Sequence, residues 1–282
     1  MDYGHDLQFG TFITPRNSPP RAPVELARLS ERLGYDLVAF QDHPYQPRFH
    51  DTWTLLSYVA ATTTTIQLAP DVANLPLRQP AVLARAAASL DLLSGGRFNL
   101  GLGAGGFWDA IEAMGGRRLT PGQSVDALAE AIEIIHGIWD PDVREPLHGG
   151  DLYPVRGAKR GPAPAHRIPI WIGAYRPRML RLTGRMADGW LPSLGYLQRA
   201  DLADGNARVD DAATDAGRDP RDVRRLLNIS GGEGTEAIAA LALEHGFSTF
   251  ISAGDDPAAA ERYAAEVIPA VRQTVASERA RG

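Results

Sequence analysis

The 282-residue chain contains no cysteine. Disulfide bridges, thiolate nucleophiles and cysteine-bound metal sites are therefore excluded. The first residues, 1–6, are polar and acidic, whereas a secretory leader would be basic and then apolar. No apolar run approaches the length that spans a bilayer. These absences predict a cytoplasmic protein without a membrane partner.

The sequence also lacks a block of basic residues. Its formal net charge is -5, and the arginines near its end alternate with acidic residues. We therefore expect no nucleic-acid partner. Neither an H-x-x-x-H nor an H-E-x-x-H spacing occurs, which argues against a metal site, and a G-x-S-x-G nucleophile elbow is absent.

What the chain does contain is an alternation of strand-like and helix-like segments. Strands are expected at 8–13, 36–41, 66–72, 97–102, 168–172, 189–192, 223–230 and 248–251. Helices are expected at 23–33, 51–63, 80–93, 121–139, 176–187, 198–216, 236–244 and 257–276. Eight such units predict an α/β fold, a single (β/α)8 barrel domain over 1–282. The irregular segment 140–167 predicts an insertion after the fourth unit, with a hairpin or extended excursion near 148–153.

The segment 88–106 resembles a helix end, a glycine stop, a short strand and a glycine-rich loop. Within it, Gly101, Gly103 and Gly106 match the spacing of a dinucleotide-binding loop. That motif requires a helix starting on the last glycine and an acid at the end of the next strand. Here the next helix is expected only near Thr120, and no strand with a terminal acid follows. The doubly wound alternative is therefore disfavoured.

Barrel enzymes carry reactive groups at the carboxyl ends of their strands. The second strand is followed by Asp42, His43 and Pro44, and an acid beside an imidazole suits proton transfer. The alternative is that these residues only cap a loop. The third strand ends with Asp71 and Asn74, which need polar partners but are equally explained as a polar turn.

The fifth and sixth strands end with residues suited to an anion. The segment 173–177 leads into a helix with proline in its first turn, and exposed amides at such a position bind phosphate. Arg176 is either a second phosphate contact or a solvated side chain. Ser193 lies at the end of the sixth strand. We expect His136, His166 and His245 to be structural.

Together these residues resemble the bacterial luciferase-like flavin-dependent oxidoreductases. The resemblance is carried by 78–84 continuing through 89–97 to 100–105, by Asp42 with His43, and by 170–174 followed by 187–190. It implies a (β/α)8 barrel with an insertion after the fourth unit. It also implies reduced FMN or the deazaflavin F420 at the carboxyl ends of the strands.

The resemblance further implies residue roles. A non-proline cis peptide behind the flavin ring is expected between Asp71 and Val72. The other expected cofactor contacts are Asp42, His43, Ala104 and Asp109 near the ring, and Gly173, Ala174, Tyr175 and Ser193 near the ribityl chain or phosphate. The family often has two glycines where Tyr175 and Arg176 stand here, which puts the phosphate contact in question.

The order Asp-His-Pro resembles the F420 branch, in which the imidazole acts as an acid or base. We therefore expect F420-dependent hydride transfer to or from a small organic substrate, with His43 catalytic. The alternatives are an FMN monooxygenase using O2, and a non-catalytic flavin-binding protein. A flavin or F420 reductase is the expected electron source.

The resemblance also implies a homodimer through the second and third helices. A partly aromatic pocket is expected from Phe49, Trp53, Phe107 and Trp108.

Overall fold

The computed structural model describes residues 2–281, and it is built around a parallel sheet. The strands are β1 (Gln8–Ile13), β2 (Leu37–Phe40), β3 (Gln67–Pro70), β4 (Ala73–Asn74), β5 (Leu100–Gly103), β8 (Ile170–Ile172), β9 (Gly189–Trp190), β10 (Arg224–Ile229) and β11 (Thr249–Ala253). Their order is β3-β2-β1-β11-β10-β9-β8-β5-β4. A parallel bridge joins Leu68 of β3 to Phe98, just before β5, at the other end of this order. The sheet therefore closes into a barrel, with β3 and β4 together forming its third strand.

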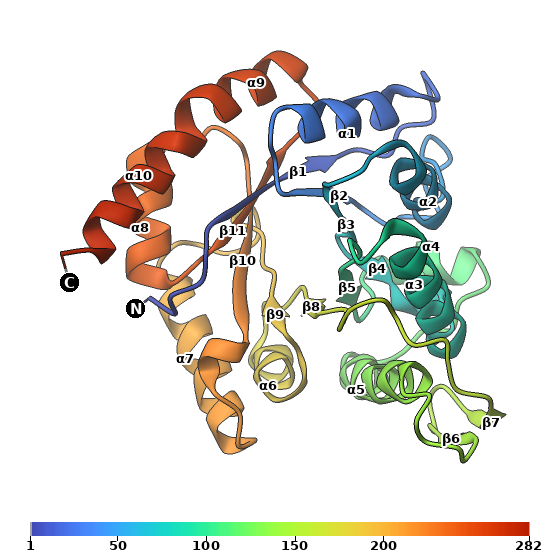
Figure 1. Ribbon diagram of the computed structural model, residues 1–282. Coiled ribbons are helices and arrows are strands. Elements are labelled where there is room, and N and C mark those ends of the chain that lie inside the picture. The colour runs from blue at the N-terminus through green and yellow to red at the C-terminus, as the bar shows by residue number, and fades with distance from the viewer. Residues whose placement is uncertain (1, 282) are drawn as a thin grey trace.

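Helices surround the strands in chain order (Figure 1). They are α1 (Ala22–Arg32), α2 (Thr52–Thr62), α3 (Pro80–Ser94), α5 (Pro121–Trp139), α6 (Pro177–Met186), α7 (Asp201–Asp215), α8 (Thr235–His245), α9 (Pro257–Arg262) and α10 (Ile268–Arg279). The two ends of the chain lie on the same side, where Arg279 pairs with Asp2 at 2.7 Å. The predicted (β/α)8 architecture is confirmed.

Local sequence explains several helix boundaries. Thr120 caps α5 through a reciprocal capping box with Gln123, as its position before Pro121 predicts. Gly95 ends α3 in the left-handed conformation, with φ of 73°. One helix was expected over 257–276, but a π-helical turn, Tyr263–Val267, separates α9 from α10. Pro269 follows this turn and has no N–H to continue the α-helical ladder, which accounts for the widening.

The glycines of β5 make room for the third strand of the barrel. A Cβ atom on Gly101 would lie 2.3 Å from the carbonyl oxygen of Pro70, and one on Gly103 would lie 2.7 Å from Cγ2 of Val72. The chain bulges there, and the peptide bond between Asp71 and Val72 is cis, as expected. The close approach that these glycines permit is therefore to a neighbouring strand.

The structure differs from the prediction in the segment after β5. A short helix, α4 (Trp108–Ala113), begins two residues after Gly106, where no helix was expected before Thr120. The following barrel strand, β8, still ends without an acid, so the dinucleotide-binding motif is not completed. Between α5 and β8, strands β6 (Leu147–Gly149) and β7 (Val155–Ala158) form an antiparallel pair outside the barrel.

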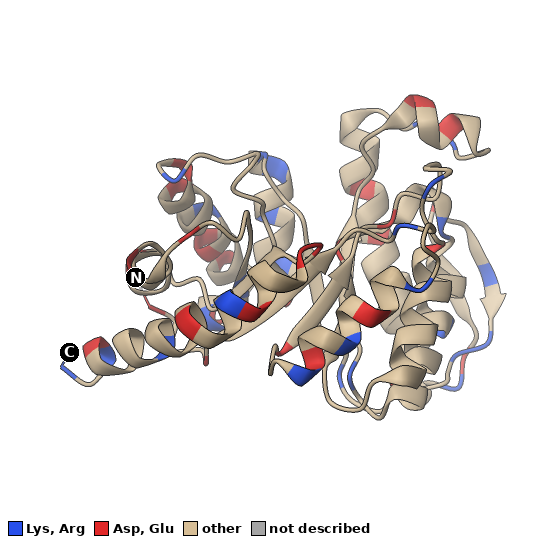
Figure 2. Cartoon of the chain, turned by 90° about the horizontal axis from the view of Figure 1, so that it is seen from above, with Lys and Arg blue, Asp and Glu red and all other residues tan. Residues whose placement is uncertain are grey.

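Buried side chains fill the space inside the barrel below its carboxyl end. Leu37, Ala39, Ala69, Trp171, Leu191, Leu226 and Ile251 form this inner cluster. A ligand must therefore bind above them. On the outside, acidic and basic residues are mixed over the helices in the view of Figure 2. Within residues 2–281, no helix is both long enough and apolar enough to cross a membrane.

Candidate active site

A cavity of about 790 Å³ lies where the barrel strands end. Gln41 follows β2, Asp71 follows β3, Ala104 follows β5 and Gly173 follows β8, while Asn228 belongs to β10. This volume is within the range of cofactor and substrate sites. The carboxyl ends of parallel strands thus converge on one site, as the barrel predicts.

Most of the residues expected to contact a cofactor line this cavity. They are Asp42, His43, Asp71, Val72, Ala104, Gly173, Tyr175 and Ser193. Two expected residues lie elsewhere. Asp109 is 98% exposed in its side chain and pairs with Arg118. Trp108, the first residue of α4, lines the cavity. Asp109 follows it and points about 100° away around the helix. Ala174 is fully buried, and its carbonyl accepts a hydrogen bond from Nε1 of Trp190 at 2.9 Å.

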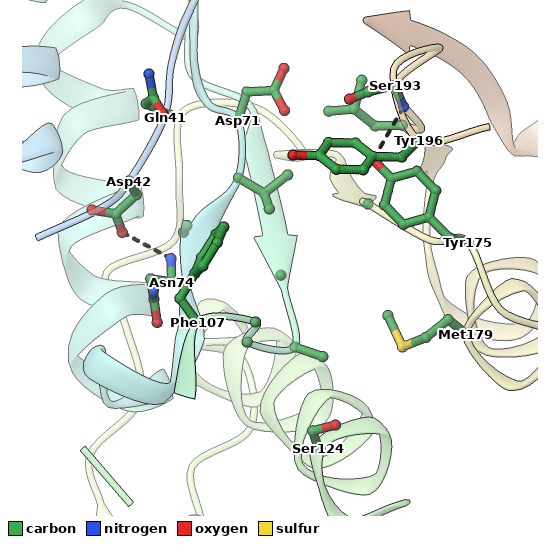
Figure 3. Close-up of a pocket in the computed structure, with 18 of the residues that line it drawn as sticks. Gln41, Asp42, Asp71, Asn74, Phe107, Ser124, Tyr175, Met179, Ser193 and Tyr196 are labelled. Carbon is green, nitrogen blue, oxygen red and sulfur yellow. Dashed lines mark hydrogen bonds between the residues drawn. The ribbon is translucent and has the colours of Figure 1, made fainter. Parts of the chain in front are cut away.

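Asp42 is held by an extensive set of hydrogen bonds. Its buried carboxylate accepts the backbone N–H of Asn74 at 2.9 Å and two bonds from Arg78 at 2.7 Å each. Figure 3 shows the bond to Asn74. Arg78 also binds Asp51, the residue that caps α2. This bidentate pair ties the end of the second strand to the third, so Asp42 shapes the wall with its charge already compensated.

His43 is half-buried beside two aromatic rings. Its imidazole stacks on Tyr45 at a centroid distance of 5.4 Å and meets the edge of Phe107 at 5.5 Å. Burial lowers the pKa of His43, and the neighbouring charge of Asp42 opposes this shift only in part. The ring is therefore neutral near neutral pH. Within residues 2–281, neither ring nitrogen has a hydrogen-bond partner, so one donor and one acceptor remain available to a ligand.

A polar network crosses the mouth of the barrel from β3 to β10. Nδ2 of Asn228 donates to Oδ1 of Asp71 at 3.2 Å and to Oγ of Ser193 at 3.1 Å. The backbone N–H of Ser193 donates to the hydroxyl of Tyr175 at 3.2 Å, the second dashed bond in Figure 3. Burial raises the pKa of Asp71 to about 7, although the bond from Asn228 partly offsets the effect.

Three buried acceptors in this cavity have no partner among the described residues. They are Oδ2 of Asp71, Oδ1 of Asn74 and Oδ1 of Asn228. Buried polar atoms in folded proteins are nearly always hydrogen-bonded, so these three indicate a polar ligand. Sequence reasoning did not select Asn228. Its signal is an amide near the carboxyl end of an otherwise apolar strand, which requires a polar partner.

The other side of the cavity is suited to an anion. Gly122 and Ser124 come from the first turn of α5, and Arg176 caps the start of α6. Backbone N–H groups and the positive end of each helix dipole favour a phosphate there. Arg176 is exposed and lines the cavity, whereas Arg178 binds Asp126 at 2.5 Å.

The cavity is partly aromatic, but the residues differ from those expected. Phe107 and Trp108 line it, together with Phe12, Tyr45, Tyr175 and Tyr196. Phe49 and Trp53 do not. Phe49 pairs with Arg16 in an isolated bridge, and Trp53 packs against Phe98. Phe49 lies late in the loop between β2 and α2, past the part of that loop that lines the cavity, and Trp53 lies in the first turn of α2.

The fold and the site together define a barrel enzyme with its active site at the carboxyl ends of the strands. Residues 7–281 match the family described as luciferase-like monooxygenase, and the chain belongs to this family. The expectation of an oxidoreductase is confirmed over that of a non-catalytic flavin-binding protein.

Curated relatives give the same assignment. The chain is 30% identical over 276 residues to 5,10-methylenetetrahydromethanopterin reductase of Methanolobus tindarius, covering 98% of this chain and 80% of the relative. It is 36% identical over 205 residues to phthiodiolone/phenolphthiodiolone dimycocerosates ketoreductase of Mycobacterium tuberculosis, covering 69% of this chain. The match spans only 50% of the length of that ketoreductase.

Solved structures confirm the fold. An F420-dependent secondary alcohol dehydrogenase in complex with an F420–acetone adduct superposes with a TM-score of 0.81 at 18% identity, covering 95% of this chain and 99% of the other. A riboflavin lyase with modified FMN and riboflavin gives a TM-score of 0.82 at 15% identity, covering 96% and 92%. At these identities the likeness establishes the barrel and leaves the choice of cofactor open.

Proposed function

We propose that this chain transfers hydride between the deazaflavin F420 and a small organic substrate. The observation that carries the proposal is the state of His43. Its imidazole is neutral, lines the cavity, and has ring nitrogens without a partner among the described residues. When bound, F420 supplies or accepts the hydride. Two similar proteins, a 5,10-methylenetetrahydromethanopterin reductase and an F420-dependent secondary alcohol dehydrogenase, support the choice of F420-dependent hydride transfer.

The residues present fit a flavin-like group. The unpartnered oxygens of Asn74 and Asn228 offer hydrogen-bond acceptors to a heteroaromatic ring, and the unpartnered Oδ2 of Asp71 offers a further polar contact. The ring would be held by Asp42, Asp71, Val72 and Ala104, and the ribityl chain and phosphate by Gly173, Tyr175, Ser193 and Arg176. Tyr175 thus stands where a glycine was expected, but its hydroxyl already accepts from Ser193 and leaves the helix start open. Asp109 and Ala174 do not belong to this proposed set.

His43 would exchange the proton that accompanies hydride transfer. A carbonyl carbon that gains hydride needs a proton on its oxygen, and the reverse reaction needs that proton removed. The neutral imidazole would accept the proton when the substrate is oxidised, and the imidazolium so formed would return it when the substrate is reduced; the lowered pKa favours that release. Tyr45 stacks on the ring and Phe107 makes an edge contact with it, and both restrict its orientation. An F420-reducing enzyme would supply the electrons.

An FMN-dependent monooxygenase is the second candidate function. The starts of α5 and α6 with Arg176 suit a terminal phosphate as well as they suit the phosphodiester of F420. One similar structure is a monooxygenase of Streptomyces bottropensis, with a TM-score of 0.77. In this case a separate flavin reductase would provide reduced FMN, and O2 would be consumed.

An anaerobic assay separates the two functions. The protein is mixed with reduced F420 and a panel of ketones, imines and enones, and the absorbance of oxidised F420 is followed. We expect F420 oxidation that depends on both protein and substrate. A parallel assay measures O2 uptake with reduced FMN. Substrate-dependent O2 uptake, without F420 turnover, would contradict the proposal and favour the monooxygenase.

We also propose a homodimer formed through α2 and α3. Leu55, Leu56, Val59, Leu83, Ala87 and Leu90 are buried in the core of the protomer. A second apolar set remains exposed on the same two helices, with Leu93 87% exposed and Val82 68% exposed beside Tyr58 and Leu92. These helices are neighbours in Figure 1. Exposed large apolar residues on neighbouring helices support a protein–protein interface there.

A further inference from the structure

Asp71 lies at the floor of the cavity, directly after β3, and extends toward β10. Its Oδ1 accepts the amide hydrogen of Asn228 at 3.2 Å. Its Oδ2 is buried and has no partner among the described residues. Figure 3 shows the carboxyl between the strand that bears Gln41 and the segment that bears Ser193, with both oxygens away from the ribbon. One oxygen is thus fixed, and the other is free for a ligand.

Among residues 2–281, no cation forms an ion pair with Asp71. The ionisable groups that face the cavity are Asp42, His43, Tyr45, Tyr175, Tyr196, Arg176 and Arg178. Of these, Arg178 is bound to Asp126, and Arg78 behind the wall is bound to Asp42 and Asp51. Asn228 and Ser193, the neutral groups of the network, face Asp71 from β10 and from the end of β9. Burial therefore acts almost alone on this carboxyl and raises its pKa to about 7.

We propose that Asp71 takes up a proton when a planar heteroaromatic ligand covers the cavity floor, and that its protonated Oδ2 donates a hydrogen bond to that ligand. A ligand that displaces water disfavours the carboxylate further. Because Asn228 keeps a donor on Oδ1, the proton is placed on Oδ2, the oxygen without a partner. The ligand must then present an acceptor there, such as a ring carbonyl or ring nitrogen. The inference rests on the proposed function, since the ligand is its cofactor ring.

Asp71 and His43 would then hold protons on different sides of one ligand. His43 follows the second strand, whereas Asp71 follows the third and is directed across the mouth toward the seventh. The neutral imidazole of His43 offers one hydrogen-bond donor and one acceptor. The protonated carboxyl of Asp71, with Oδ1 already bonded to Asn228, offers the ligand a donor. Asp71 is therefore the residue that would select a ligand with an acceptor at the floor of the cavity.

Calorimetry measures the proton uptake directly. F420 and FMN are each titrated into the purified protein at about pH 7.5, in three buffers with different ionisation enthalpies. The dependence of the observed enthalpy on buffer gives the number of protons bound. With an initial pKa near 7, the wild type is expected to take up as much as about three-quarters of a proton more than Asp71→Asn. The ligand's own ionisation cancels in this difference.

Two controls make the result specific. His43→Asn removes the imidazole of the site and is expected to retain the uptake seen in the wild type. Binding with equal proton uptake in the wild type and Asp71→Asn would overturn the inference and leave the proposed function standing. If neither F420 nor FMN binds, both the proposed function and the inference about Asp71 are wrong.

A second measurement does not depend on folding of the variant. Wild-type protein labelled with 13C at the aspartate carboxyls is titrated by NMR with and without ligand. We expect one aspartate to titrate near neutrality when free and at a higher pH when the ligand is bound. If every aspartate titrates in the ordinary acidic range in both states, Asp71 does not hold a proton and the proposal is overturned.

Discussion

At the scale of single residues, the cavity combines satisfied and unsatisfied polar groups. Asp42 has three donors on its carboxylate, and its role is to fix the wall. By contrast, the ring nitrogens of His43 and the buried Oδ2 of Asp71 have no hydrogen-bond partner among the described residues. Groups without protein partners are the ones that a ligand can bind, so chemistry is expected at His43 and Asp71 rather than at Asp42.

Replacing His43 tests its catalytic role. His43→Asn is expected to lower turnover by about 10²–10⁴-fold, the usual contribution of a general acid or base. The melting temperature should change little, because the imidazole makes no hydrogen bond to the described residues. His148→Asn, an exposed histidine on β6, is the matched control and should retain wild-type turnover. Unchanged turnover in His43→Asn would remove this residue from the mechanism.

Asp71 should make stability depend on pH in a defined direction. Its folded-state pKa of about 7 lies above the ordinary value of 3.8, so the folded state binds the proton more tightly than the unfolded chain. This contribution is fully present below about pH 4 and is lost as pH rises through 7. Asp71→Asn should therefore gain stability relative to the wild type between about pH 5 and pH 8, on the order of 2–4 kcal/mol. Urea unfolding of both proteins at about pH 5 and about pH 8 measures the difference in unfolding free energy. If that difference is the same at both pH values, the pKa of Asp71 is ordinary and the prediction is wrong.

At the scale of elements, β5 and the third strand fit together through their glycines. Gly101→Ala would place a Cβ atom 2.3 Å from the backbone oxygen of Pro70, which cannot move without the strand. We expect a loss of about 1–3 kcal/mol or more, as for overpacked cores, with weaker ligand binding because the bulge would shift. Gly106→Ala is the control, since a Cβ there meets nothing within 4 Å. Equal stability of the two variants in chemical unfolding would contradict this account of β5.

Elements whose boundaries depend on nearby residues were predicted well. The capping residues fix the start of α5 at Pro121, and Gly95 fixes the end of α3 close to its expected position. The short helix α4 was not predicted, because six residues give too little periodicity to recognise. The π-helical turn before Pro269 was also not predicted. The apolar pattern runs through it unchanged and does not indicate how the backbone adjusts to the N–H that proline lacks.

The candidate site was predicted where one residue at a strand end suffices, and not where partners come from distant strands. Asp42 and His43 were selected by their position after the second strand and Asp71 by the family resemblance, and all three line the cavity. The partner of Asp42 is Arg78, which the sequence places 36 residues away, and the partner of Asp71 is Asn228, 157 residues away. Such pairings depend on closure of the barrel and have no local signal. Asp109 was misplaced relative to the cavity because α4 turns it outward.

At the scale of the whole molecule, closure of the barrel brings the second, third, sixth and seventh strands to one cavity. The apolar residues left on α2 and α3 lie on the outside of that barrel. Leu93→Asp is expected to shift the protein from dimer to monomer in analytical ultracentrifugation, because an unpaired charge would be buried in the interface. Val143→Asp, at an exposed apolar residue outside these helices, should keep the wild-type state. A wild type that sediments as a monomer would contradict the dimer.

A pair of equilibrium titrations tests most directly the proposal that the cofactor is F420. Purified protein freed of bound small molecules is titrated with F420 and with FMN, and absorbance and fluorescence are followed. We expect tight binding of F420 and much weaker binding of FMN, in keeping with hydride transfer assisted by His43. Tight FMN binding with weak F420 binding would contradict it. His43 would then be a residue of the flavin site, and the enzyme would be an O2-using monooxygenase.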